Sequence, residues 1–326
     1  MKHERNLASI LFLLCMLAYY AVSFASALID GFRDAILNMG WGMSTIFSEL
    51  IIVLPGLAIL GIWYVIQEYK ESADVNYDKP LVWDRLMLNK VKISTLLMTV
   101  LFTFLIMPLS TLANYISMLF VDNVMAEATG DIIGLSAGPA ILLIALFGPM
   151  CEEFVFRGMI FGGYRRACAI LPSVFVSGLL FGLMHMNFNQ FGYAFILGCW
   201  MAIVVEATGS IWVSVLVHFL VNFRSTASIF ILNHIDASAF DNLDMSIIRG
   251  SEYRTYFLFY AVVAIVTTII ACGIVGWMAQ NEGRSNPFTE MTKKYPKGKK
   301  AIILTPSLVI GVIIALGYMI SDVLIK

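Results

Sequence analysis

The sequence predicts an all-α fold: a polytopic membrane helix bundle of about eight or nine transmembrane helices, with an active site inside the bundle. Composition is the first observation that predicts it. Of the 326 residues, 60% are hydrophobic and only 13% are charged, and the mean hydropathy is +0.84. A soluble protein carries about 25% charged residues. The second observation is a series of apolar stretches of about 20 residues, which is the length of a helix that crosses a bilayer.

Nine stretches qualify as candidate spans. The first is longer than the apolar region of a signal peptide, about 7–15 residues, so we expect a retained helix. The fifth and sixth are the shortest, and prolines or glycines at positions 172, 178, 192 and 198 interrupt them, as in half-spans or tilted helices that line a cavity. The nine predicted spans are 7–29, 45–66, 93–120, 134–163, 170–187, 190–206, 211–233, 254–279 and 301–322.

The distribution of basic residues predicts the orientation. If the N-terminus lies inside and the spans alternate, 15 of the 21 lysines and arginines fall in inside segments, 4 in outside segments and 2 within spans. Cytoplasmic loops carry this excess of positive charge. We therefore expect a multi-pass integral membrane protein with a cytoplasmic N-terminus, and its short loops favour a bacterial plasma membrane. The net charge of −1 predicts no nucleic-acid partner.

The fourth span contains two adjacent carboxylates and an arginine, which are expensive to place in a membrane and indicate function. Glu153 and Arg157 are four residues apart, so they share a helix face and are expected to pair. Glu152 lies about 100° further round the helix and is left without that partner. We therefore predict a structural role for Glu153 and a role as general base for Glu152.

The two histidines that lie deep in spans are His185 and His218. Asn222 follows His218 by four residues, so the two form one polar face on an otherwise apolar helix. Phe181 precedes His185 by one turn and is expected to form the apolar wall of a site. A buried histidine on its own often only forms a hydrogen bond between two membrane helices. The combination of both histidines with the glutamates predicts a functional site.

Two further expectations concern polar and helix-breaking residues. The dipeptide Gly148-Pro149 comes just before the glutamates and is expected to kink the helix and leave carbonyls without intrahelical partners. Glu49, Glu206 and Asp322 lie near span ends, where we expect them to reach water.

This set of residues suits hydrolysis of an amide bond inside the bilayer. A carboxylate and an imidazole can deprotonate a water molecule, and a second imidazole with a carboxamide can stabilise the resulting oxyanion. Glu152, His185 and His218 could instead bind a divalent metal such as zinc, and the sequence leaves both alternatives open. One alternative is a non-catalytic scaffold or sensor. Another is a proton-coupled transporter, since transporters also use intramembrane Glu and His.

Three motifs carry a family resemblance: E-E-x-x-x-R at 152–157, F-x-x-x-H at 181–185 and H-x-x-x-N at 218–222. Together they resemble the CPBP intramembrane proteases, which include the type II CAAX prenyl endopeptidases and the bacteriocin-processing (Abi) proteins. The resemblance covers about residues 138–230. It implies catalytic roles for Glu152, His185, His218 and Asn222, with Glu153, Arg157 and Phe181 as structural support.

The resemblance also implies a division of the chain and a class of partner. We expect N-terminal helices and a cytoplasmic loop in 1–133, a CPBP/Abi-like catalytic core in 134–233, and C-terminal helices with a basic cytoplasmic loop in 234–326. The expected partners are a peptide or lipidated protein substrate and membrane lipids. The family is usually labelled metalloprotease, although a metal-free glutamate mechanism has been argued for its prenyl-processing members.

Overall fold

A computed structural model describes residues 2–74, 76–235, 251–293 and 303–325, and this part of the chain is helical without strands. Within these residues, eight helices are long and apolar enough to cross a membrane, which confirms the predicted fold class of a multi-pass membrane protein. They are α1 (Lys2–Leu28), α3 (Trp41–Ala73), α5 (Ile93–Ser117), the continuous helical segment Ala137–Ala167, α12 (Phe188–Thr208), α13 (Ile211–Ile235), α14 (Ser251–Asn281) and α16 (Pro306–Ile325).

The fifth predicted span forms a shorter helix. Helix α11 (Ile170–Met184) has 15 residues, or about 22 Å at 1.5 Å per residue. That length is less than the roughly 30 Å of hydrocarbon in a bilayer. The remaining short helices are α2 (Asp30–Leu37), α4 (Val82–Arg85), α6 (Val124–Glu127), α7 (Thr129–Gly134) and α15 (Pro287–Thr292).

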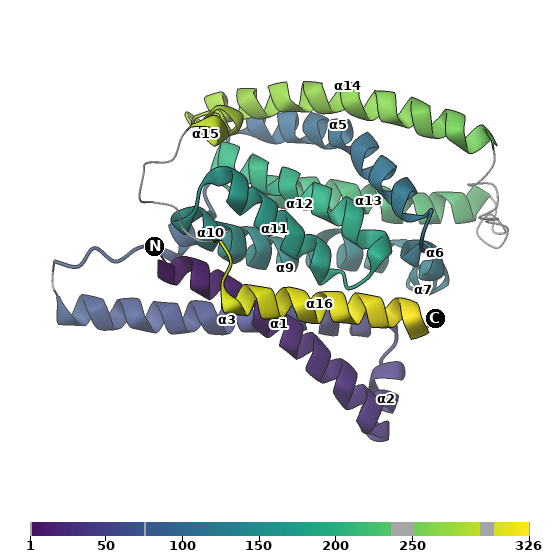
Figure 1. The fold of residues 1–326 in the computed structure, drawn as a ribbon, viewed down its shortest axis with the longest axis horizontal. Helices are drawn as coiled ribbons and strands as arrows, with labels where there is room; N and C mark the ends of the chain where they lie inside the picture. Colours follow the sequence, from purple (N-terminus) through teal and green to yellow (C-terminus); the bar gives the residue numbers. More distant parts are fainter. Residues whose placement is uncertain (1, 75, 236–250, 294–302, 326) are drawn as a thin grey trace.

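The long helices lie side by side and alternate in direction (Figure 1). Helix α14 packs along α5, and α16 packs along α1. The central layer consists of the fourth span with α11, α12 and α13. Helices from both ends of the chain therefore surround the segment that carries the polar motifs.

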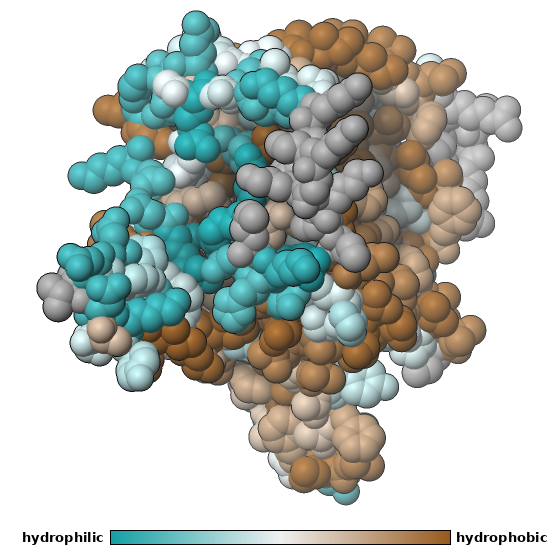
Figure 2. Space-filling view, turned by 60° about the vertical axis from the view of Figure 1, so that its left-hand side comes forward, coloured by the Kyte–Doolittle hydropathy of each residue, from teal (hydrophilic) through white to brown (hydrophobic). Residues whose placement is uncertain are grey.

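Loops expected on the inside gather at one end of the bundle, beside the start of α1 (Figure 1). Glu4 of α1 forms ion pairs there with Arg85, at 3.1 Å, and with Arg166, at 3.0 Å. The backbone N–H of Lys92 donates to Glu282 at 3.0 Å. Figure 2 shows hydrophilic residues concentrated on this face. The basic residues counted at 249, 294–300 and 326 lie outside the described residues, and the cytoplasmic orientation of this end stays a prediction.

Glycines expected to interrupt α11 and α12 instead bring these two uninterrupted helices into close contact. A Cβ atom on Gly178 would lie 2.5 Å from Sγ of Cys199, and one on Gly198 would lie 2.9 Å from Cα of Gly178. A membrane helix must keep its backbone hydrogen bonds, and small residues let a neighbouring helix approach. The expected helices that line a cavity are present, because α11 is too short to span a bilayer and residues of both helices line the central cavity.

The fourth span contains two π-helical segments within an otherwise α-helical run. It runs through α8 (Ala137–Ala140), a π-helical segment η1 (Ile141–Phe147), α9 (Gly148–Glu153), a second π segment η2 (Phe154–Phe161) and α10 (Gly162–Ala167). A π-helix uses i→i+5 hydrogen bonds and is frequent at functional sites. In that register the carbonyl of Ile144 would accept from residue 149, which is a proline without an N–H. The predicted free carbonyl is therefore present.

Candidate functional site

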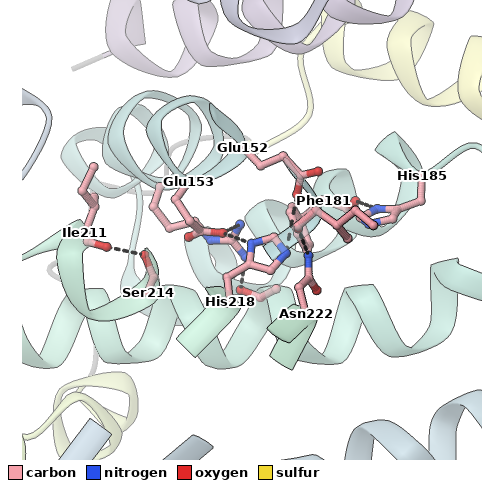
Figure 3. A network of polar contacts seen from close by, with 11 residues as sticks. Glu152, Glu153, Phe181, His185, Ile211, Ser214, His218 and Asn222 are labelled. Carbon is pink, nitrogen blue, oxygen red and sulfur yellow. Dashed lines mark hydrogen bonds and ion pairs between the residues drawn. The ribbon is translucent and has the colours of Figure 1, made fainter. Parts of the chain in front are cut away.

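The polar motifs meet between three helices in the middle of the bundle. Glu152 and Glu153 end α9, and they face α13, which carries His218 and Asn222 (Figure 3). His185 comes from the end of α11, on the adjoining side. The structure thus brings all four predicted catalytic residues to one place, although they are spread over about seventy positions of the sequence.

Glu153 is fully buried and paired, as its spacing predicted. Nη1 of Arg157 donates to Oε1 of Glu153 at 2.8 Å, and neither side chain is exposed. The guanidinium also donates to the carbonyl of Gly198 at 3.2 Å and lies 4.2 Å from the ring centroid of Phe181. Arginine is therefore held by a carboxylate, a carbonyl and an aromatic face, and the pair joins α9, α11 and α12.

His218 lies between the two glutamates. Its Nδ1 is 3.0 Å from Oε1 of Glu153, and its Nε2 is 3.8 Å from Oε2 of Glu152. Because a carboxylate can only accept a hydrogen bond, Nδ1 carries a hydrogen and donates it to Glu153. The first contact fixes the ring, and the second is too long for a direct hydrogen bond. Nε2 therefore points toward Glu152 with space between them.

His185 is fixed in the same way by its own helix. Its Nδ1 lies 2.9 Å from the carbonyl oxygen of Phe181, so Nδ1 donates and Nε2 of the neutral ring is an acceptor. The Phe181 ring packs edge-on against His185 and His218, with centroid distances of 5.1 and 5.6 Å. Phe181 also stacks on Arg157, so a single apolar ring positions both histidines and the buried cation.

Asn222 bonds to the carbonyl that Pro149 leaves free. Its Nδ2 donates to the carbonyl of Ile144 at 3.0 Å. A carboxamide nitrogen has two hydrogens, so one remains for another acceptor. The π segment and the proline together fix the orientation of Asn222 toward the space beside Glu152 (Figure 3).

Glu152 faces a cavity of about 450 Å³. Its side chain is 18% exposed, and Oε2 has no hydrogen-bond partner among the described residues. The same cavity is lined by His185, His218 and Asn222, and it is large enough to admit part of a peptide. The side chain predicted to be the base thus lines the cavity, whereas its fully buried neighbour Glu153 is bound through Oε1.

One acidic residue of this cavity was misjudged from the sequence. Glu49 was expected to reach water near a span end, but only 8% of it is exposed and it lines the cavity from α3. The reason is that α3 begins at Trp41 and runs for 33 residues, so Glu49 lies more than two turns inside the helix. Glu206, expected to reach water as well, forms an ion pair with Arg165 at 2.7 Å.

The sequence named Glu152, His185 and His218 as possible metal ligands. Among the described residues, no group of three or more His, Cys, Asp and Glu side chains is arranged to hold a metal ion. Both histidines use Nδ1 for a bond within the protein, which leaves Nε2 of each ring as the possible ligand atom, and the closest approach between Glu152 and His218 is the 3.8 Å noted above. No step of the chemistry below is therefore assigned to a metal.

The fold and the site define a class: a multi-pass membrane protein with a glutamate and two histidines around a cavity inside the bundle. Residues 134–224, which include every one of these motifs, match the family described as Type II CAAX prenyl endopeptidase Rce1-like. This segment is similar to the Rce1-like type II CAAX prenyl endopeptidase (CPBP) family. The resemblance seen in the sequence is thereby confirmed.

Two curated bacterial proteins are similar to the same part of the chain. Membrane-embedded CAAX protease MroQ of Staphylococcus aureus is 31% identical over 88 residues, which cover 25% of this chain and 36% of MroQ. YdiL of Bacillus subtilis, provisionally named a membrane peptidase, is 27% identical over 97 residues, which cover 29% of this chain and 39% of YdiL. The chain therefore spans less than two fifths of the length of either relative. No solved structure matches the chain significantly.

Proposed function

We propose that this protein is an intramembrane endopeptidase that hydrolyses a peptide bond of a membrane-associated peptide or protein. The observation that carries the proposal is the unpaired Glu152 carboxylate in a cavity that it shares with His185, His218 and Asn222. The family match and the similarity to MroQ support a peptidase. The buried pair of Glu153 and Arg157 holds the helices around this site together.

In the proposed mechanism a water molecule binds between Glu152 and His185. Nε2 of His185 accepts one of its hydrogen bonds and orients it, and Glu152 removes a proton as the water oxygen attacks the peptide carbonyl carbon. The free hydrogen of Asn222 stabilises the oxyanion of the tetrahedral intermediate. Glu152 then returns its proton to the leaving amine, and the C–N bond breaks.

His218 completes this mechanism as a second hydrogen-bond donor to the oxyanion, beside Asn222. Its Nδ1 hydrogen is committed to Glu153, so Nε2 can donate to the oxyanion only when the ring is protonated. The productive arrangement is therefore an ionised Glu152 beside a protonated His218, whose positive charge Glu153 balances. This requirement refines the role of His218, which the sequence motif assigned without a protonation state.

The residues that line the cavity indicate the side from which substrates enter. Besides Glu152 it is lined by Trp41 and Asn123, which lie at the end of the bundle opposite the basic loops, and by the exposed Arg224. If the N-terminus is cytoplasmic, as the basic residues predict, this end faces the outside of a bacterial plasma membrane. A cysteine at position 45 should then react with a membrane-impermeant maleimide added to intact cells.

Cleavage of a quenched fluorescent peptide library by the purified protein in liposomes tests the proposed function. Wild-type protein should cleave at least one sequence, and Glu152→Ala and His185→Ala should lower the rate by about 10²–10⁴-fold. Cys151→Ala is the matched control, because Cys151 precedes Glu152 and takes no part in the site. Full activity of the Glu152 variant would refute the mechanism and favour a scaffold or sensor.

The same assay decides between glutamate-activated and metal-assisted hydrolysis. If Glu152 activates the water without a metal, activity persists after a strong chelator has removed all metal, which metal analysis of the treated protein verifies. Loss of activity that zinc restores would assign Glu152, His185 and His218 as ligands after a rearrangement of the site.

A further inference from the structure

Glu49 is a buried carboxylate that the hydrolytic mechanism does not use. It lies on α3, outside residues 134–224 that match the family. Its Oε2 has no hydrogen-bond partner among the described residues, and it forms no ion pair with any of them. The side chain is 92% buried and borders the same cavity as Glu152. An unpaired carboxylate directed into a substrate cavity indicates that its partner comes from the ligand.

The protein makes room for this carboxylate beside the catalytic helix. A Cβ atom on Gly148 would lie 3.2 Å from Oε1 of Glu49 and 3.6 Å from its Cδ. Gly148 precedes Glu152 by four residues, so Glu49 lies about one helical turn, roughly 6 Å, from the base along α9. An extended peptide advances about 3.3–3.6 Å per residue. A group bound by Glu49 would therefore lie within about two residues of the bond that Glu152 attacks.

The charges of the cavity indicate which group this is. The ionisable side chains that line it are Glu49, Glu152, His185, Tyr193, His218 and Arg224. Arg224 is exposed at the mouth, and the other arginine of the site is bound by Glu153. A buried carboxylate is costly unless a cation or a proton neutralises it. The deep part of the cavity therefore complements a positive charge.

We propose that Glu49 forms a subsite that binds the cationic side chain of a lysine or arginine in the substrate, next to the scissile bond. This inference rests on the proposed peptidase function, because it assigns the specificity of the same cavity. Glu49 would accept charge-assisted hydrogen bonds from the ammonium or guanidinium group. In the absence of substrate a proton neutralises it.

Binding can be tested without any cleavage. Dicyclohexylcarbodiimide is an apolar reagent that modifies carboxyl groups within membranes, and mass spectrometry can locate the product. In the Glu152→Gln protein, n-butylammonium, which mimics a lysine side chain, should slow modification of Glu49 by about tenfold, the effect of one charge-assisted hydrogen bond. n-Butanol is the neutral control and should not protect. Equal modification with both compounds, or none at Glu49 under any condition, would overturn the subsite.

A peptide-cleavage assay is the second test of the subsite. Peptides that carry lysine within two residues of the scissile bond should have a kcat/KM about tenfold above that of the norleucine analogues. Glu49→Gln should remove this difference and retain cleavage of the norleucine peptides. Thr45→Val is the matched control, since Thr45 lies one turn away in the same cavity and bonds only to its own helix. A lysine preference that survives Glu49→Gln would refute the proposal. If wild-type protein cleaves no peptide, the proposed function fails, and protection by n-butylammonium still decides the subsite.

Discussion

Two neighbouring glutamates in this protein have opposite surroundings. Glu153 is fully buried with Arg157 at 2.8 Å and His218 at 3.0 Å, so its charge is balanced within the protein. Glu152 lies on the next face of the helix, where its Oε2 has no hydrogen-bond partner among the described residues and the residue lines a cavity that also holds the unpaired Glu49. One carboxylate is used to hold helices together, and the other two remain available to a ligand.

The difference arises from a rotation of about 100° between adjacent residues of a helix. It places Glu153 against α13 and turns Glu152 into the cavity. Partners, rather than burial, therefore separate structural from chemical carboxylates here. Substitutions at the two positions should separate in the same way, and this separation can be measured.

The largest expected effect is on activity at Glu152. Glu152→Gln should reduce kcat by on the order of 10²–10⁴-fold, because the amide cannot accept a proton from water. The midpoint of unfolding in detergent should not fall, because no bond within the protein is lost. Both quantities can be measured on one purified sample. A variant that loses stability as well would show that Glu152 is as structural as Glu153.

The next effect is on stability at the buried pair. Arg157→Met leaves Glu153 buried without its cation and should lower the free energy of unfolding by about 3–5 kcal/mol. The double variant with Glu153→Gln should recover much of this loss, because removing both charges is often neutral. Unfolding in mixed micelles with increasing dodecyl sulfate measures all variants. If the double variant is as unstable as Arg157→Met, hydrogen bonds to the guanidinium, rather than the charge of Glu153, dominate.

The sequence predicted the paired carboxylate better than the unpaired ones. Glu153 and Arg157 are four residues apart on one helix, so their contact follows from helical geometry alone. Pro149 likewise predicted a carbonyl without an intrahelical partner, but only the structure shows that it is the carbonyl of Ile144 and that Asn222 binds it. Of these two contacts, only that of Glu153 with Arg157 needed nothing beyond local rules.

Contacts between distant helices could not be predicted. The depth of Glu49 depends on where α3 begins and on its packing against Gly148, which is about a hundred residues away in the sequence. The bond from His218 to Glu153 likewise depends on how α13 packs on α9. The sequence showed that α11 and α12 contain glycines, but only their packing shows that these residues face one another.

A smaller effect tests the support behind Arg157. Its guanidinium bonds to the carbonyl of Gly198, which is in close contact with Gly178. Gly178→Ala would place a methyl group 2.9 Å from the backbone nitrogen of Cys199 and should cost about 1–3 kcal/mol. Gly61→Ala is the control, because nothing lies within 4 Å of its added Cβ. Equal stability of the two variants would show that α11 and α12 can separate without loss.

The smallest effect on stability concerns the packing of Gly148 against the unpaired Glu49. Gly148→Ala places a methyl group 3.2 Å from Oε1 of Glu49. The end of this side chain can move by a few tenths of an ångström, so the cost should remain below the about 1–3 kcal/mol of rigid overpacking. Displacing the carboxylate should nevertheless reduce the preference for lysine over norleucine peptides, with cleavage of the norleucine peptides retained. If Glu49→Gln abolishes that preference and Gly148→Ala leaves it unchanged, Glu49 binds the cation from a position that does not depend on Gly148.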